Sequence, residues 1–412
     1  MAASNLERWK SIERGREKIL KILNISKQEV ERGLELHRNS IVCDSLGGDP
    51  EPWSPRMIQK REELLNAGKP TREILRETEK LRRQEIAESP EYHKDYLEHW
   101  TKSGVTCAVQ GDIKKSLWDL PTALNGISQF EYRFTKLKDI LVKATSAEDI
   151  REAKNQGKHA LIMDLQNSVL LGGGVDVNRE LENLELLYGL GIRAMQLTYN
   201  LRNFVGDGCT ERNAAGLSNF GIRVVEEMNR LGMLVDVAHC GPKTTLDAVE
   251  FSKDPVAATH TCCRSVYDHP RGKSDEELKA IAEKGGYVGI FVLETFIAKQ
   301  GTIRDFLDHI DHAVKLIGVD HVGIGTDHDL EYWPKPAQSW LDRFAEERNW
   351  WYGYKPEHRA GSKYTTDTSW EDFAWTNWPY YTVGLVSRGY SDQEIQKIIG
   401  GNFLKLFERV VG

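Results

Sequence analysis

Eight short, mostly apolar runs recur along the chain, and each has the length of a β-strand. Several are apolar on both faces, which is typical of strands buried between a core and a layer of helices. The runs cover residues 40–46, 104–110, 160–166, 192–199, 233–239, 256–261, 287–292 and 321–328. The pattern therefore indicates strands that are covered on both sides.

Helical patterns separate the later runs and carry start and stop signals. Ser218 and Gly232 suit an N-terminal cap and a C-terminal glycine, and Ser274 opens a Ser-x-x-Glu capping box. Because eight strands alternate with helices, we predict an α/β fold, a (β/α)8 TIM-type barrel. An open doubly wound sheet is the alternative, and we favour it less because no glycine-rich phosphate fingerprint follows the first run. The predicted helices cover residues 178–191, 218–232, 244–255, 274–286, 302–318 and 391–410.

Three segments fall outside this alternation. We predict an N-terminal helical extension at 1–38 and the barrel at 39–412, with a helical insertion at 51–100 and an aromatic-rich insertion at 328–381. The last segment holds seven of the eleven tryptophans. Long segments with little apolar periodicity are usually functional or part of an interface. A lid over the barrel mouth and a subunit interface are equally good interpretations of it.

Composition narrows the function classes. The chain has 412 residues and a net charge of −7, so we expect neither nucleic acid nor a membrane surface as a partner. The first residues show no apolar segment of the secretory kind, and no run approaches the roughly 20 apolar residues of a spanning helix. Six scattered cysteines without CxxC spacing are typical of reduced thiols in a cytoplasmic protein.

Polar residues at the ends of the predicted strands are the candidates for chemistry, because barrel enzymes place their sites there. His239 and His260 end two successive runs, so their imidazoles would project into one mouth. Imidazole and carboxylate groups are the ligands that zinc prefers. Asp327, at the end of the last run, could accept a proton as general base. The competing interpretation is that both histidines are hydrogen-bonded core residues.

Several stretches resemble signatures of the membrane dipeptidase (renal dipeptidase) family of amidohydrolase-like barrels, in family order. That resemblance implies a two-zinc site that hydrolyses dipeptides. By position, His239 and His260 match the two histidines on one metal, and Asp327 matches the catalytic aspartate. Arg271 matches an arginine that binds the substrate carboxylate, a task that suits a guanidinium. The stretches are "LYGLGIRAMQLTYN", "GLSNFGIRVVEEMNRLGMLVDVAHC", "THTCCRSVYDHPRGKSDEEL", "HVGIGTDHD" and "SRGYSDQEIQKIIGGNFLKLF".

The chain departs from the family pattern at its metal ligands. Leu46 and Gly48 stand where the family has the histidine and aspartate of its His-x-Asp motif, and Gln166 replaces the glutamate that bridges both metals. Tyr199 replaces a histidine that contacts substrate. Two dications without this charge compensation would repel each other strongly. We therefore expect at most one divalent ion, for which zinc is suited, on His239 and His260, with a metal-free site as the open alternative.

These residues predict a dipeptidase-like hydrolase of an amide or related C–N bond in a small carboxylate-bearing substrate. Asp327 is the expected base, Asp44 and Tyr199 are further acid–base candidates, and Tyr199, Gln166 and Arg271 are candidates for binding substrate. Asp44, Gln166 or Asp327 would complete the sphere of one metal ion. Two alternatives stay open: a metal-independent lyase or isomerase, and a non-catalytic binding protein that retains the pocket. The resemblance also implies a homodimer.

Overall fold

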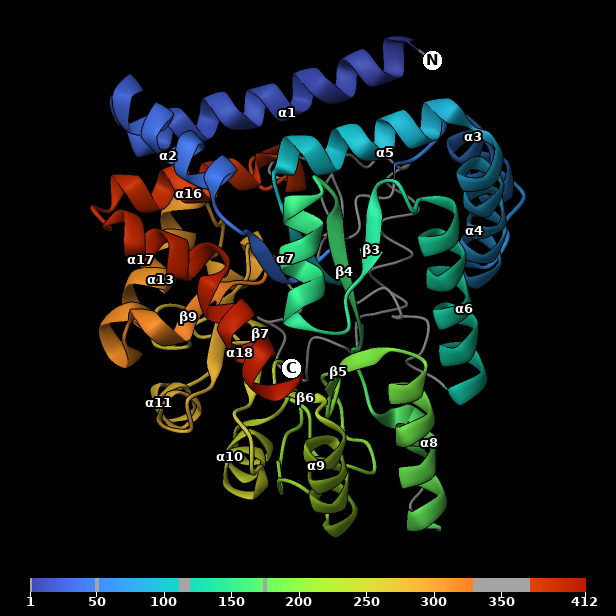
Figure 1. Ribbon diagram of the computed structural model, residues 1–412, viewed down its shortest axis with the longest axis vertical. Coiled ribbons are helices and arrows are strands. Elements are labelled where there is room, and N and C mark those ends of the chain that lie inside the picture. Colours follow the sequence, from blue (N-terminus) through green and yellow to red (C-terminus); the bar gives the residue numbers. More distant parts are fainter. Residues whose placement is uncertain (1, 49–51, 111–118, 173–175, 329–370) are drawn as a thin grey trace.

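The computed structural model describes residues 2–48, 52–110, 119–172, 176–328 and 371–412 (Figure 1). A parallel sheet of nine strands forms its centre. Eight strands follow in the order β1-β2-β4-β5-β6-β7-β8-β9, and β3 pairs with β4 beside this path. The strands are β1 (Cys43–Gly47), β2 (Cys107–Gln110), β3 (Leu141–Lys143), β4 (His159–Leu165), β5 (Ile192–Gln196), β6 (Leu234–Asp236), β7 (Ala257–Thr261), β8 (Tyr287–Ile290) and β9 (Val322–Ile324). The eight predicted runs thus correspond to the eight ordered strands.

The first and last strands come together and close the barrel. The Asp327 amide donates to the carbonyl of Leu46 at 2.7 Å, and the Gly48 amide donates to the carbonyl of His328 at 3.2 Å. These bonds join the end of β1 to the segment that follows β9. The predicted (β/α)8 barrel is confirmed.

The barrel interior is narrow around Ser45. Its hydroxyl donates to the carbonyls of Thr259 at 2.7 Å and of Ile324 at 3.0 Å. A Cβ added to Gly289 or Gly325 would lie 2.5 or 2.6 Å from Ser45 Oγ. Glycine on β8 and directly after β9 therefore leaves the room that this central serine occupies.

Helices surround the barrel, and most begin and end where their caps predict. The Ser218 side chain accepts from the Gly221 amide, and Ser274 forms the expected capping box with Glu277. The helices that follow β4 to β8 are α8 (Val177–Gly189), α9 (Asn219–Leu231), α10 (Pro242–Phe251), α11 (Asp275–Glu283), α12 (Glu294–Ile297) and α13 (Ile303–Ile317). Two further helices, α6 (Leu120–Lys136) and α7 (Ala147–Asn155), flank β3.

The C-terminal helical segment is interrupted, whereas the sequence pattern predicted one helix over 391–410. A π-helical turn at Lys397–Gly401 separates α17 (Asp392–Gln396) from α18 (Asn402–Val410). A Cβ on Gly400 would lie 2.3 Å from the carbonyl oxygen of Ile41. The close approach of this turn to the chain before β1 accounts for the break.

Helices outside the barrel occupy the predicted extension and the first insertion. Figure 1 shows α1 (Ala2–Leu23) lying along α5 (Pro90–Ser103) at one end of the molecule, and the rings of Trp9 and His99 are 5.2 Å apart. The other helices of these regions are α2 (Lys27–Asn39), α3 (Pro55–Asn66) and α4 (Thr71–Glu88). None of the helices in the described ranges is long and apolar enough to cross a membrane.

The end of the aromatic-rich insertion is packed into the molecule. Trp375, in η6 (Trp375–Asn377), and Trp378, in α16 (Trp378–Ser387), are fully buried. Helix α1 holds this segment, because Arg14 pairs with Glu371 at 2.7 Å and Lys18 pairs with Asp372 at 2.8 Å. Residues 372–378 are thus buried, and most of the segment 328–381 that was predicted as a lid or an interface, residues 329–370, lies outside the described residues.

Candidate active site

Two buried imidazoles face each other at the end of the barrel where the strands terminate. His239 follows β6 by three residues, and His260 lies in β7. Their Nε2 atoms are 2.9 Å apart, and their ring centroids are 4.9 Å apart. The side chains are 3% and 0% exposed. The structure therefore brings together the two histidines that the sequence placed in one mouth.

The outer nitrogen of each ring is held by a polar neighbour. His239 Nδ1 lies 2.7 Å from Oδ1 of Asn200, and His260 Nδ1 lies 2.9 Å from Oγ1 of Thr259. The Thr259 hydroxyl in turn donates to Oδ2 of Asp236 at 2.5 Å. Partners of this kind fix the orientation of imidazoles that bind a metal or exchange protons.

Tyr199 and Asn200 reach the pair from the loop after β5. The Tyr199 ring stacks on that of His239, with centroids 4.0 Å apart and planes 21° apart. Asn200 has φ of +54° and Asp327 has φ of +53°, a left-handed backbone that is uncommon outside glycine. Of the non-glycine residues in the described ranges, Asn24 alone shares it. Two strand-end loops at the mouth thus hold a rarely adopted backbone, which is frequent at functional sites.

Arg271 joins the two loops that carry the histidines. Its guanidinium donates to the carbonyl of Ala238 at 2.8 Å and to the carbonyl of His260 at 3.2 Å, and the side chain is 3% exposed. It also lies over the Phe291 ring at 5.5 Å. The structure thus gives Arg271 a part in holding His239 and His260, and its role toward a substrate carboxylate stays a prediction.

Asp44 is enclosed by hydrogen-bond donors. Oδ1 accepts from the Thr326 amide at 2.8 Å, and Oδ2 accepts from the Thr326 hydroxyl at 2.7 Å. Oδ2 also accepts from the indole nitrogens of Trp375 and Trp378, both at 3.1 Å. Burial raises the pKa of Asp44, and these hydrogen bonds act in the opposite direction. These bonds connect Asp44 to the C-terminal segment, and its predicted catalytic role stays a prediction.

Leu46 and Gln166, which stand at two of the family's metal-ligand positions, are buried. Leu46 is 2% exposed within the apolar core. Gln166 directly follows β4 and is 1% exposed, and its Oε1 has no hydrogen-bond partner among the described residues. Asp327 is partly exposed beside the buried His328. Of the three family ligand positions that differ in this chain, only Gln166 carries a polar side chain.

The comparison with known proteins decides the family. The model of the membrane dipeptidases, peptidase family M19, matches residues 100–335, which is more than half of the chain. The chain belongs to the membrane dipeptidase family. Among relatives, dipeptidase verJ of Clonostachys rogersoniana is 28% identical over 278 residues, or 67% of this chain and 61% of that protein. An uncharacterized dipeptidase of Schizosaccharomyces pombe is 35% identical over 187 residues, or 43% of each chain.

These matches span less than two thirds of the length of either curated relative. A solved structure gives wider coverage. An amidohydrolase from Pseudomonas aeruginosa is 27% identical and superimposes with a TM-score of 0.67 over 92% of this chain and 99% of its own. The structural similarity therefore extends well beyond the residues that the membrane dipeptidase model matches.

Membership of the membrane dipeptidase family implies a divalent metal, so the donors can be tested against it. The described residues include no group of three or more His, Cys, Asp or Glu side chains placed to hold an ion. Catalytic zinc usually keeps three protein ligands. The residues therefore do not fit the two-metal centre that the resemblance implied. The facing Nε2 atoms of His239 and His260 fit as two ligands of one ion.

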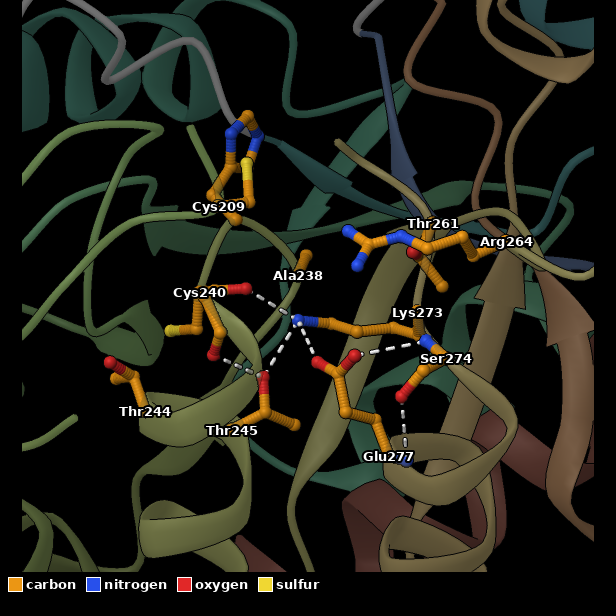
Figure 2. A network of polar contacts seen from close by, with 12 residues as sticks. Cys209, Ala238, Cys240, Thr244, Thr245, Thr261, Arg264, Lys273, Ser274 and Glu277 are labelled. Carbon is orange, nitrogen blue, oxygen red and sulfur yellow. Dashed lines mark hydrogen bonds and ion pairs between the residues drawn. The ribbon is translucent and has the colours of Figure 1, made fainter. Parts of the chain in front are cut away.

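A buried ion pair that was not predicted from the sequence supports the loop behind His239. Lys273 Nζ donates to the carbonyl of Cys240 at 2.7 Å and to Thr245 Oγ1 at 2.8 Å, and it lies 3.2 Å from Glu277 Oε1 (Figure 2). Lys273 and Glu277 are each 1% exposed. Their i,i+4 spacing in the sequence is compatible with an ion pair. Only the structure shows that the pair is buried beside Cys240, the residue that follows His239.

The Lys273–Glu277 pair predicts a pH-dependent stability. Burial would raise the pKa of Glu277, but the Lys273 charge and hydrogen bonds from Ser274 bring it below the ordinary 4.5. The stabilisation is therefore present above pH 4.5 and is lost as pH falls through the lower folded-state pKa. We expect Glu277→Gln to lower the free energy of unfolding by about 1–3 kcal/mol at pH 7, and this gap should narrow below pH 4.5.

Urea unfolding of the wild type and of Glu277→Gln between pH 7 and pH 3.5 measures the difference in their free energies of unfolding. Glu276→Gln, on the same helix, is the matched control and should change little. If this difference in free energy stays constant over the pH range, the Glu277 charge does not contribute to stability.

Proposed function

We propose that this membrane dipeptidase family member is a hydrolase of an amide or related C–N bond in a small substrate that bears a carboxylate. The facing pair of His239 and His260 carries the proposal, because it lies at the strand ends where barrel enzymes place their chemistry. The names of the related dipeptidases support a peptide bond as the scissile group.

The positions of these residues suggest a role for each of them in hydrolysis. Asp327 would take the proton of the attacking water, and its backbone is fixed by the bond from its amide to Leu46. The N–H groups of Arg271 that are not used on Ala238 and His260 would hold the substrate carboxylate. Tyr199, stacked on His239, and Gln166, whose buried Oε1 has no hydrogen-bond partner among the described residues, would contact the rest of the substrate.

We propose further that the site holds at most one divalent ion, with zinc favoured by the imidazole donors of His239 and His260. Such an ion would polarise the scissile carbonyl. Leu46, Gly48 and Gln166 leave too few anionic ligands for a second ion. Asp44 is hydrogen-bonded on both oxygens and would support the mouth through Thr326.

Metal analysis combined with a dipeptide panel tests the function. Protein purified without chelator should contain no more than one equivalent of zinc and should hydrolyse some dipeptides with a free carboxyl terminus. Amidating that terminus should lower kcat/KM by about 10- to 100-fold, because the charge-assisted bonds to Arg271 are lost. Two equivalents of zinc would overturn the one-ion proposal. Full activity without any metal would favour the metal-independent alternative, and retention of a dipeptide without turnover would favour a binding protein.

Location and assembly are proposals as well. None of the six cysteines forms a disulfide, which agrees with a reducing, cytoplasmic environment. A small-molecule substrate and a homodimer complete the proposal, and light scattering of the purified chain would measure the assembly.

A further inference from the structure

A chain of three buried side chains runs behind the histidine pair. His260 Nδ1 lies 2.9 Å from Thr259 Oγ1, and Thr259 Oγ1 lies 2.5 Å from Asp236 Oδ2. Asp236 Oδ1 accepts from the amides of Ala238 at 2.9 Å and Thr259 at 3.1 Å. Asp236 and Thr259 are each 1% exposed. Water therefore does not compete for these bonds.

The direction of the hydrogen bonds follows from the number of available protons. Burial raises the pKa of Asp236, and its hydrogen bonds and the Arg271 charge act in the opposite direction. Its two oxygens accept from two backbone amides and one hydroxyl, and this set of donors favours the carboxylate form. An ionised Asp236 can only accept, so the single hydroxyl proton of Thr259 points at it. Thr259 Oγ1 is then left to accept from His260, and His260 must carry its proton on Nδ1.

We propose that Asp236 and Thr259 are positioning residues that hold His260 in the Nδ1–H tautomer. In this state Nε2 of His260 directs its lone pair at Nε2 of His239, 2.9 Å away, so without an ion the proton between the two rings must come from His239. The part that His260 plays in hydrolysis rests on the proposed function. The tautomer depends on Thr259 and Asp236 at Nδ1 of His260 and on His239 at its Nε2.

Two substitutions of Thr259 separate the effect of its hydroxyl from the effect of its shape. Thr259→Val keeps the shape and removes the hydroxyl, whereas Thr259→Ser keeps the hydroxyl. Valine leaves Nδ1–H of His260 without its acceptor, so the ring can adopt the other tautomer. Removing the outer partner of a functional imidazole typically costs 10- to 100-fold in activity or metal affinity.

The tautomer is measured directly by nitrogen NMR of protein labelled in its histidine rings, with the His260 signals identified by their loss in His260→Gln. We expect the Nδ1–H form in the wild type and in Thr259→Ser, and an Nε2–H or mixed form in Thr259→Val. In turnover, kcat should fall about 10- to 100-fold for valine and less than about 3-fold for serine, with KM little changed.

Two results would overturn the proposal: an Nε2–H His260 in the wild type, or valine and serine variants with the same tautomer and the same kcat. If Thr259→Val does not fold, Asp236→Asn gives a second test, because an amide can donate to Thr259 and reverse the chain. If the wild type hydrolyses no dipeptide, the proposed function fails, but the NMR result still decides the role of Asp236 and Thr259.

Discussion

Replacing Asp327 with asparagine is expected to lower kcat/KM by about 10²- to 10⁴-fold, the usual contribution of a general base. The carboxylate would be replaced by an amide of the same size that cannot take a proton at neutral pH. Asparagine is the right substitution because it tolerates the left-handed backbone at φ of +53°, which alanine would strain. Steady-state hydrolysis of the best dipeptide of the panel measures the effect.

The control for this prediction is Glu31→Gln on α2, an exposed carboxylate outside the mouth. Its kcat/KM should equal that of the wild type. Thermal unfolding of the Asp327→Asn protein should also be unchanged within a few degrees. A loss of activity of less than about 3-fold would remove Asp327 from the role of base.

Replacing Asp44 with asparagine should lower the free energy of unfolding by about 3 kcal/mol. Its carboxylate accepts from four donors: the amide and hydroxyl of Thr326 and the indoles of Trp375 and Trp378. An amide nitrogen in place of either oxygen would face at least one buried donor, which costs about 1–3 kcal/mol. The remaining bonds would also lose their ionic acceptor and weaken. Urea unfolding followed by tryptophan fluorescence measures the loss.

Trp378→Phe is the matched control for Asp44, because it removes one indole donor and keeps most of the packing. It should cost about 1 kcal/mol. In the double variant the two losses should fall short of their sum, since the same hydrogen bond is removed twice. Additive losses would show that the indole and the carboxylate are not coupled.

Much of the fold could be predicted from periodicity, because barrel strands leave long apolar runs. The strand β3 was missed because Leu141–Lys143 is too short to show a period. The break in the last helix depends on the backbone of Gly400 meeting Ile41, which is far away in sequence. Neither feature has a local signal strong enough to compete with the helices and strands around it.

The candidate site was likewise predicted only in part. Strand-end position was enough to bring His239 and His260 together, because parallel strands all finish at one end of a barrel. Asp44 was predicted at the mouth for the same reason, but one of its hydrogen bonds comes from Trp375, more than 300 residues further along the chain. Asp236 and Thr259 were missed because an acid and a hydroxyl next to apolar residues resemble ordinary strand residues until their distances are known.

The contacts of α1 with residues 371–372 have a practical consequence. Arg14 and Lys18 fasten the start of the segment whose tryptophans enclose Asp44, and Arg16 reaches the side chain of Asn377 at 2.8 Å. A shortened chain that begins at the barrel would lack this helix and would release that segment. Truncations designed for crystallisation should therefore keep the whole of α1.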